Sequence, residues 1–315
     1  MDAMHRIECA LEAAVALGEG RGGPPRLAAA VRHAVFPPGA RIRPQLCVAV
    51  AQACGGDDPA LTDAAAAAVE LLHCASLVHD DLPCFDNALS RRGRSSVHVA
   101  YGERLAVLAG DALIVLAFQQ LAQCASVQPS RLGRVIARVA AGVAMPHGIA
   151  AGQAWECEPR PVLRDYQRAK TGSLFAAAAA AGAESSGADP TPWLEFGDCL
   201  GEAYQVADDI RDVVAEPQAI GKPTGQDVTH GRPSSAIEFG LDGALSQFDG
   251  LVQGCIAAIP DCRGASALRA LVRAEARRLV PLEMTVAHAG RQRSAAAAGS
   301  RGELEALRGG RSRRR

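Results

Sequence analysis

Hydrophobic positions recur at spacings of three and four residues through most of the chain, which is the period at which one face of an α-helix repeats. Six segments follow this pattern, and several are apolar on most faces, as expected for helices inside a bundle. The predicted helices are Leu61 to Leu82, Tyr101 to Ala125, Arg131 to Ala144, Leu174 to Ala183, Trp193 to Val214 and Gly264 to Leu279. Glycine- and proline-rich clusters, such as ESSGADPTP at 184–192, separate them like loops between long antiparallel helices. The pattern therefore predicts an all-α, single-domain antiparallel helical bundle.

Composition agrees with this prediction. Of the 315 residues, 49% are hydrophobic and 21% are charged, which is typical of a folded globular chain. Only 4% are aromatic and alanine dominates, so the intrinsic preference is helical nearly everywhere. Because no shift in composition marks a second domain, we expect one domain over residues 1–300 and a basic, disordered tail over residues 301–315.

Charge and cysteine content argue against several classes of function. The net charge of −1 provides no global field that would recruit nucleic acid. No stretch approaches about 20 apolar residues without a charge, and the N-terminal segment MDAMHRIECALEAA is charged where an export signal would be apolar. The ten cysteines include no C-x-x-C pair, which disfavours zinc and redox motifs. We therefore expect a cytoplasmic protein with reduced thiols and no membrane span.

The first candidate site is an aspartate cluster, HDDLPCFD, at the end of a strongly apolar predicted helix. Its carboxylates belong to Asp80, Asp81 and Asp86. A continuous helix would place Asp80 and Asp86 on different faces. Pro83 lies between them and should end or distort the helix, so the chain can fold Asp86 back towards Asp80.

The second candidate site is another aspartate cluster, QVADDIRD, about 130 residues further along the chain. Asp208 and Asp212 are four residues apart, so an α-helix places them on one side with Asp209 flanking. Carboxylates this close repel one another unless a cation joins them. Oxygen ligands without accompanying histidine and cysteine pairs favour Mg²⁺, completed by water and phosphate. A solvated acidic turn is the alternative for one cluster, but two such clusters favour a magnesium site for a phosphorylated substrate.

Basic residues surround these clusters. Guanidinium groups suit bidentate contacts with phosphate, although either arginine pair alone is typical of a surface. The two pairs are Arg41 with Arg43 and Arg91 with Arg92. The chain contains only two lysines, Lys170 in AKTG and Lys222 in IGKPTGQD, where each offers a point charge near permissive glycines. AKTG is not a phosphate-binding P-loop, because the G-x-x-x-x-G-K spacing is missing.

Five motifs together resemble those of the trans-isoprenyl diphosphate synthase family over about residues 30–240. In the order of the family they are GARIRP, HDDLPCFDNALSRRGRSSVH, AKTGSLF, YQVADDIRD and GKPTGQDVTHGRP. The resemblance implies an all-α bundle around a deep central cavity, usually in a homodimer, with the two aspartate clusters facing each other across the mouth. It also implies a prenyltransferase that condenses isopentenyl diphosphate with allylic diphosphates head to tail and releases diphosphate.

The same resemblance implies a role for each matching residue. Mg²⁺ would be the metal, with three ions once diphosphate is bound, and Mn²⁺ could take its place. The metal ligands would be Asp80, Asp81, Asp86, Asp208, Asp209 and Asp212. The allylic diphosphate would contact Arg91, Lys170 and Lys222, whereas isopentenyl diphosphate would contact Arg43, Arg92 and His73. Gln205 and Thr171 would place dipoles near the reacting carbons. The expected catalytic set is Asp80, Asp81, Asp86, Lys170, Thr171, Gln205 and Asp208. Helical position alone would make His73 a satisfied core histidine.

Two positions differ from the family in the positively charged residues that bind substrate. A lysine that binds isopentenyl diphosphate is replaced by Ala40, and we expect Arg41 to compensate as a substrate-binding residue. Arg232 stands where a lysine is usual, which keeps a charge for substrate binding. These changes bear on the affinity for isopentenyl diphosphate and leave the metal site intact.

The length of the product is predicted from helix geometry. One turn rises about 5.4 Å, roughly an isoprene unit, so Ala75 and Ser76 lie about one turn from Asp80 and would form the floor of the cavity. Farnesyl-producing relatives commonly carry a bulky aromatic at the position of Ala75. Its absence resembles geranylgeranyl diphosphate synthases and predicts a C20 product, although small residues at a helix crossing are the alternative. The motifs are most similar to enzymes that feed carotenoid and bacteriochlorophyll synthesis.

Three alternative functions remain for comparison. A farnesyl or longer-chain diphosphate synthase would differ in product only. A terpene cyclase is disfavoured by the low aromatic content and by DDIRD where N-D-x-x-S-x-x-x-E is expected. A noncatalytic modulatory subunit would usually lose aspartates or the basic residues of RRG, which are present here, but Ala40 keeps this alternative open.

Overall fold

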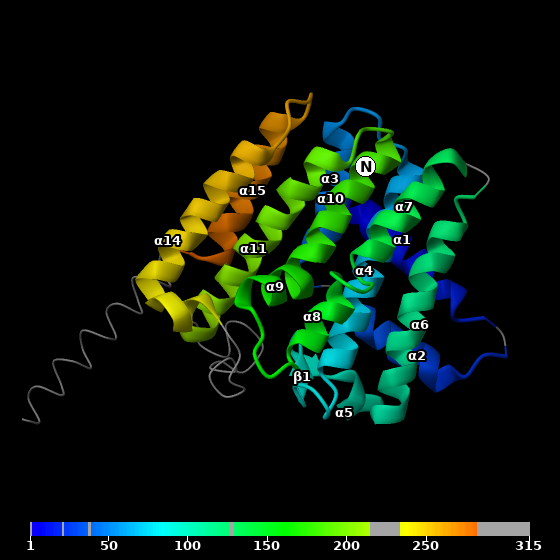
Figure 1. Ribbon diagram of the computed structural model, residues 1–315. Coiled ribbons are helices and arrows are strands. Elements are labelled where there is room, and N and C mark those ends of the chain that lie inside the picture. Colours follow the sequence, from blue (N-terminus) through cyan, green and yellow to red (C-terminus); the bar gives the residue numbers. More distant parts are fainter. Residues whose placement is uncertain (1, 21, 37–38, 126–128, 215–233, 282–315) are drawn as a thin grey trace, which may run out of the picture.

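The computed structural model describes residues 2–20, 22–36, 39–125, 129–214 and 234–281, and most of these residues are helical (Figure 1). One two-stranded hairpin is present among them. The elements are α1 (Ala3–Leu17), α2 (Pro25–Val35), α3 (Ile42–Ala53), α4 (Pro59–Asp80), β1 (Ser90–Arg91), β2 (Arg94–Ser95), α5 (Val97–Tyr101), α6 (Glu103–Ala122), α7 (Pro129–Ala141), α8 (Ile149–Trp155), α9 (Leu163–Gln167), the π-helix η1 (Arg168–Gly172), α10 (Ser173–Ser186), α11 (Thr191–Val214), α14 (Ser235–Ala258) and α15 (Ala265–Leu279). The prediction of an all-α bundle is confirmed.

All six predicted helices are present, with ends within three residues of the predicted ones. The first residue of one predicted helix, Tyr101, belongs to α5 instead of α6, because Gly102 adopts a φ of 90° and separates the two helices. The pattern did not assign α1, α2, α3, α5, α8, α9, η1 or α14. The 24-residue α14 was not predicted because glycines recur along its sequence. One of them, Gly240, kinks the helix with a φ of 70°.

The centre of the bundle is formed by α4 and α10 (Figure 1). Every residue of α10 from Leu174 to Ser185 is buried, because its run of alanines lets neighbouring helices approach closely. Gly182 marks one such approach, since a Cβ atom there would lie 2.3 Å from the carbonyl oxygen of Cys47 on α3. One hydrophobic core extends from Ile7 to Leu279, as a single domain requires. The predicted boundary at residue 300 and the tail at 301–315 lie outside the described residues.

Two helices, α4 and α6, are long and apolar enough to cross a membrane by length and composition. The core helix of a folded protein meets the same criterion, and 78% of the most apolar stretch of α4 is buried inside the bundle. Only 39% of the corresponding stretch of α6 is buried, and this stretch contains one charged residue, Asp111. Much of the apolar surface of α6 therefore faces outwards, and the absence of a membrane span stays a prediction.

Candidate active site

The first aspartate cluster lies where α4 ends. Asp80 is the last residue of the helix, and Pro83 follows in a series of tight turns. The backbone N–H of Asp86 donates to the carbonyl oxygen of Asp80 at 3.0 Å. The structure therefore brings Asp86 back beside Asp80, as the position of Pro83 predicted.

A third carboxylate, Glu156, joins these two. Asp80, Asp86 and Glu156 each offer an oxygen, and the three oxygens lie within 4.8 Å of one another. We call these residues the carboxylate group. Gln153 steadies it, because its Nε2 donates to Oδ1 of Asp80 at 3.0 Å. Gln153 and Glu156 belong to none of the five sequence motifs, and they lie at the end of α8 one helical turn apart.

Lys170 connects the carboxylate group to η1. Its Nζ lies 3.4 Å from Oδ1 of Asp80 and also pairs with Glu156, which accepts a further 2.8 Å hydrogen bond from the hydroxyl of Tyr166. Gly152 permits this packing, since a Cβ atom there would lie 2.3 Å from the Cα of Lys170. The wide turn of η1 is an irregularity typical of functional sites, and here it carries both Lys170 and Thr171.

Asp81 has a different environment from Asp80. It is buried, and its Oδ1 accepts a 2.9 Å hydrogen bond from Nε of Arg91. Burial raises the pKa of Asp81, while Arg91 opposes this rise. Arg91 reaches it from the hairpin, where Arg92 and Gly93 form a two-residue turn with φ angles of 53° and 74°. Arg91 also lies 3.7 Å from Asp80, so it serves both aspartates.

The second aspartate cluster contacts the first through η1. The hydroxyl of Thr171 donates to Oε1 of Gln205 at 2.6 Å, and Nε2 of Gln205 donates to Oδ1 of Asp209 at 2.9 Å. Gly201 allows α11 to approach η1, since its Cβ would lie 2.5 Å from the Cα of Gly172. Two consecutive residues of η1, Lys170 and Thr171, thus touch the two clusters.

Asp209 differs from its neighbours in the second cluster. It is 2% exposed, and its Oδ2 accepts hydrogen bonds from the side chain of Gln167 at 3.1 Å and from the backbone N–H of Ser235 at 2.7 Å. Burial raises the pKa of Asp209 to about 6, although the hydrogen bonds from Ser235 and Gln205 oppose the rise. Asp208 is more exposed than Asp212. The carboxylate group found among the described residues includes none of these three aspartates, so their binding of metal stays a prediction.

Arg43, His73 and Arg92 form a basic cluster that is a candidate for binding a second substrate. Nη1 of Arg43 donates to Nε2 of His73 at 3.4 Å, and its guanidinium lies 4.4 Å from the centre of the Phe175 ring. Nε of Arg43 is buried without a hydrogen-bond partner, so an anion would satisfy it. Burial lowers the pKa of His73 well below its ordinary value, and nearby arginines add to this effect, so the ring is neutral. Ala40 is exposed and adds no charge.

Arg41 lies in a buried, ion-paired environment. Its side chain is fully buried, and its nitrogens contact Glu8 at 2.9 Å, Glu70 at 2.7 Å and the carbonyl oxygen of Val35 at 2.9 Å. Burial opposes the charge, but these carboxylates hold the pKa of Arg41 above its ordinary value. Arg41 thus joins α1 to α4 through Glu8 and Glu70, and its role in substrate binding stays a prediction.

The remaining predicted residues divide into two sets. Ala75 is buried in α4, and Ser76 donates from its hydroxyl to the carbonyl oxygen of His73 at 2.8 Å. Their role as the floor of a cavity stays a prediction, as does the deep central cavity itself. Lys222 and Arg232 lie outside the described residues.

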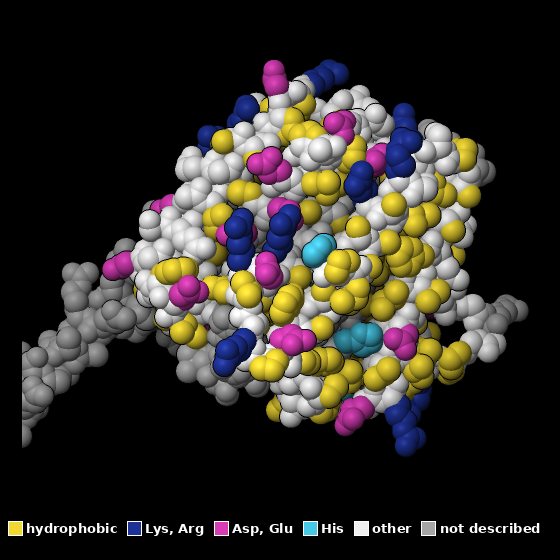
Figure 2. Space-filling view, in the orientation of Figure 1, with side chains coloured by type: hydrophobic (Ala, Val, Ile, Leu, Met, Phe, Trp, Pro, Cys, Tyr) yellow, Lys and Arg dark blue, Asp and Glu magenta, His cyan; other side chains and the backbone are white. Residues whose placement is uncertain are grey.

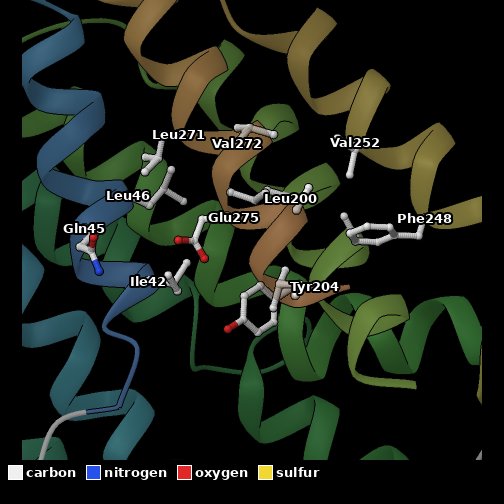
Figure 3. Close-up of a pocket in the computed structure, with 13 residues that line it drawn as sticks. Ile42, Gln45, Leu46, Leu200, Tyr204, Phe248, Val252, Leu271, Val272 and Glu275 are labelled. Carbon is white, nitrogen blue, oxygen red and sulfur yellow. The ribbon is translucent and has the colours of Figure 1, made fainter. Parts of the chain in front are cut away.

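An apolar pocket lies apart from the carboxylate group, between α3, α11, α14 and α15. Figure 3 shows Leu46, Leu200, Val252 and Leu271 around it, with Tyr204 at one end. The ring of Tyr204 packs 5.1 Å from that of Phe175, centre to centre. The pocket therefore adjoins the basic cluster of Arg43, His73 and Arg92 through Phe175, but none of the predicted site residues lines the pocket.

Residues 24–257 match the family model described as polyprenyl synthetase. The chain belongs to the polyprenyl synthetase family. It is 51% identical over 280 residues to a geranylgeranyl diphosphate synthase from Cereibacter sphaeroides, covering 89% of this chain and 97% of that one. It is 48% identical to an enzyme of the same name from Rhodobacter capsulatus, covering 88% and 96%. A geranyltransferase from Helicobacter pylori, complexed with magnesium and isoprenyl diphosphate, is 28% identical with a TM-score of 0.74, covering 87% and 97%.

Membership of the polyprenyl synthetase family makes the chain a transferase, specifically a prenyltransferase. The family resemblance read from the five motifs is confirmed. The carboxylate group of Asp80, Asp86 and Glu156 could bind the metal on which enzymes of this family depend.

Proposed function

We propose that this prenyltransferase condenses isopentenyl diphosphate with allylic diphosphates to give geranylgeranyl diphosphate (C20). The observation that carries the proposal is the junction at η1, where Lys170 contacts the carboxylate group and Thr171 contacts Gln205 of the second cluster. The names of the relatives at 51% and 48% identity support the C20 product. We further propose a role in carotenoid biosynthesis and a cytoplasmic location, which the ten free cysteines fit.

Magnesium suits the carboxylate group, because hard oxygen donors in a small number leave positions for water and phosphate. Asp80, Asp86 and Glu156 would hold it, and we propose three ions once diphosphate is bound, with Mn²⁺ as a substitute. When bound, Mg²⁺ would neutralise the charge that develops on the departing diphosphate. The aspartates of the second cluster would contribute the remaining ligands.

Lys170 and Arg91 would bind the allylic diphosphate. Both now pair with carboxylates, so the substrate would exchange these partners for phosphate oxygens. Their charges would stabilise the transition state in which the carbon–oxygen bond breaks, leaving an allylic cation. The dipoles of Thr171 and Gln205, which are hydrogen-bonded to each other, would stabilise that cation. The double bond of isopentenyl diphosphate would attack it, and the released diphosphate would take the proton.

Isopentenyl diphosphate would bind Arg43 and Arg92. His73 is neutral and accepts a hydrogen bond from Arg43, so it orients this arginine without adding charge. Because Ala40 provides no third cation and Arg41 is buried, the affinity for isopentenyl diphosphate should be weaker than in relatives with a lysine at this position.

The enzyme is proposed to form a homodimer through α6. Val107, Leu108, Ile114 and Val115 recur on one face of this helix and are 37–56% exposed. Figure 2 shows hydrophobic side chains gathered over this part of the molecule. An exposed apolar face of this kind is typical of a protein interface. Light scattering should give the mass of a dimer, and the double substitution Leu108→Glu, Val115→Glu should give a folded monomer.

Product analysis tests the proposed activity. Purified protein is incubated with Mg²⁺, labelled isopentenyl diphosphate and dimethylallyl, geranyl or farnesyl diphosphate, and the products are separated by chain length. The double variant Asp80→Ala, Asp208→Ala is the control. A magnesium-dependent C20 product that is lost in the control supports the proposal. A C15 or longer product would contradict the assigned length, and no condensation by folded protein would favour a noncatalytic subunit.

A further inference from the structure

Two cysteines on neighbouring helices lie in direct contact. The thiol of Cys255 on α14 donates to the sulfur of Cys199 on α11, and the two sulfur atoms are 3.0 Å apart. A disulfide requires about 2.05 Å, so the sulfurs need to approach by only about 1 Å. No other contact between two cysteine sulfurs is found among the hydrogen bonds of the described residues, although all ten cysteines are free.

The packing of α11 against α14 creates this contact. The two helices lie side by side (Figure 1), and the buried face of α14 includes Phe248, Val252 and Cys255. Figure 3 shows the same seam further along, with Leu200 and Val252 facing one pocket. Gly254 leaves space beside the pair, because a Cβ atom there would only just touch the sulfur of Cys199 at 3.5 Å. The cysteines are therefore held face to face by the core.

The two thiols are not equivalent. Cys255 is buried, whereas Cys199 is partly exposed and accepts the hydrogen bond. This bond lowers the pKa of Cys199, and it raises the pKa of Cys255, to which burial contributes. The acidic neighbours Glu195, Asp198 and Glu202 oppose the lowering at Cys199 and would repel an anionic oxidant. Cys199 is thus the accessible nucleophile, and an uncharged oxidant suits its surroundings.

We propose that Cys199 and Cys255 form an oxidisable dithiol, a modification site that a small disulfide converts to an intramolecular disulfide between α11 and α14. The thiolate of Cys199 attacks the oxidant, so a mixed disulfide forms, the sulfur–sulfur bond of the oxidant breaks and one small thiol leaves. The sulfur of Cys255 then attacks that of Cys199, loses its proton to solvent and displaces the second small thiol. Two protein thiols are oxidised, and one small disulfide is reduced to two thiols.

The bond would reinforce the helix that carries the second aspartate cluster without blocking it. Cys199 precedes Asp208 by nine residues, about 14 Å along α11, so the bond lies away from the carboxylates. The two cysteines are 56 positions apart in the chain. A crosslink over such a distance restricts the unfolded chain, and we expect the apparent melting temperature to rise by about 5 °C.

Thiol mapping of the full-length protein tests the proposal. Reduced protein is treated under native conditions with bis(2-hydroxyethyl) disulfide or, in parallel, with oxidised glutathione; it is then alkylated and digested. The expected result is a linked pair of peptides containing Cys199 and Cys255, formed faster with the uncharged reagent, together with the rise in melting temperature. The variant Cys255→Ser should stop at the mixed disulfide on Cys199, and Cys47→Ser, which alters another buried cysteine, should still form the bond.

Two results would overturn the proposal. One is that Cys199 and Cys255 are both recovered as alkylated thiols while the exposed Cys9, Cys84 and Cys157 are oxidised. The other is that Cys199 pairs with a cysteine other than Cys255. These readouts come from the unmodified sequence and involve no substrate, so they do not depend on folding of the variants or on the proposed prenyl transfer.

Discussion

Glu70 is a buried carboxylate that holds two arginines, so its replacement by glutamine should impair both stability and substrate binding. One oxygen lies 2.7 Å from Arg41 and 3.5 Å from Arg92. The side chains of Glu70 and Arg41 are 2% and 0% exposed, so solvent cannot replace the lost charge. Glu70→Gln keeps the shape and one acceptor but leaves Arg41 with Glu8 as its only anionic partner.

The size of the effect follows from burial. Removing one partner of a buried ion pair costs about 3–5 kcal/mol, and the remaining Glu8 favours the lower end of this range. Each kcal/mol lowers the melting temperature of a domain of 150–250 residues by about 2–4 °C, so Glu70→Gln should lower it by about 6–12 °C. The matched control is Glu12→Gln, which breaks a pair with Arg32 whose side chains are 51% and 39% exposed. An exposed pair contributes about 1 kcal/mol or less, so the control should stay close to wild type.

Thermal unfolding followed by circular dichroism measures the stability, and steady-state kinetics measures the binding. The KM for isopentenyl diphosphate should rise in Glu70→Gln, because Arg92 loses its buried partner, while the KM for the allylic substrate should change less. Equal melting temperatures for Glu70→Gln and Glu12→Gln would refute the reasoning about burial. An unchanged KM for isopentenyl diphosphate would refute the link to Arg92.

Three further predictions concern the site. Glu156→Gln should raise the Mg²⁺ concentration needed for half-maximal activity by about tenfold or more, because the carboxylate group loses a charge. Substitution of an exposed residue nearby, Glu158→Gln, serves as the control. An equal effect in both variants would contradict the assignment of Glu156 to the metal site. In metal-free protein, the pKa of Asp209, raised from 3.8 to about 6, means that the folded state retains this proton longer than the unfolded state. The contribution of Asp209 to the free energy of unfolding should therefore be fully present below pH 4 and fall by about 3 kcal/mol as the pH rises through 6, and Asp209→Asn should remove this contribution from the curve measured by urea unfolding. Ala75→Phe should shift the product from C20 towards C15 while condensation continues, and a C20 product would contradict the floor.

Local chemistry explains which site features were predictable. The return of Asp86 to Asp80 depends on Pro83 within the same turn, so it could be read from the sequence. Glu156 could not, because 70 positions separate it from Asp86 and only the packing of α8 on η1 brings it there. The one local signal for Glu156 is its spacing of three residues from Gln153, which places both side chains on one face of a helix.

Other features of the site also depend on packing between distant segments. Arg41 and Arg43 are two positions apart in one motif, but the first enters the core beside Glu70 and the second faces His73. The charge of the two arginines cannot distinguish them, because the buried position of Arg41 depends on Glu70, which is distant in the sequence. The contact between Cys199 and Cys255 was likewise invisible to a search for C-x-x-C, since two helices bring the cysteines together.

The most direct test of the account measures diphosphate release as a function of Mg²⁺ concentration in the wild type, in Asp80→Asn and in Asp208→Asn. The account places one aspartate in each of two clusters joined through Lys170 and Thr171. Both substitutions should therefore lower the rate by about 100-fold or more, because each removes charge that binds metal and stabilises the departing diphosphate. If either folded variant keeps a rate within about threefold of wild type at the same Mg²⁺ concentration, the two clusters do not form one active site.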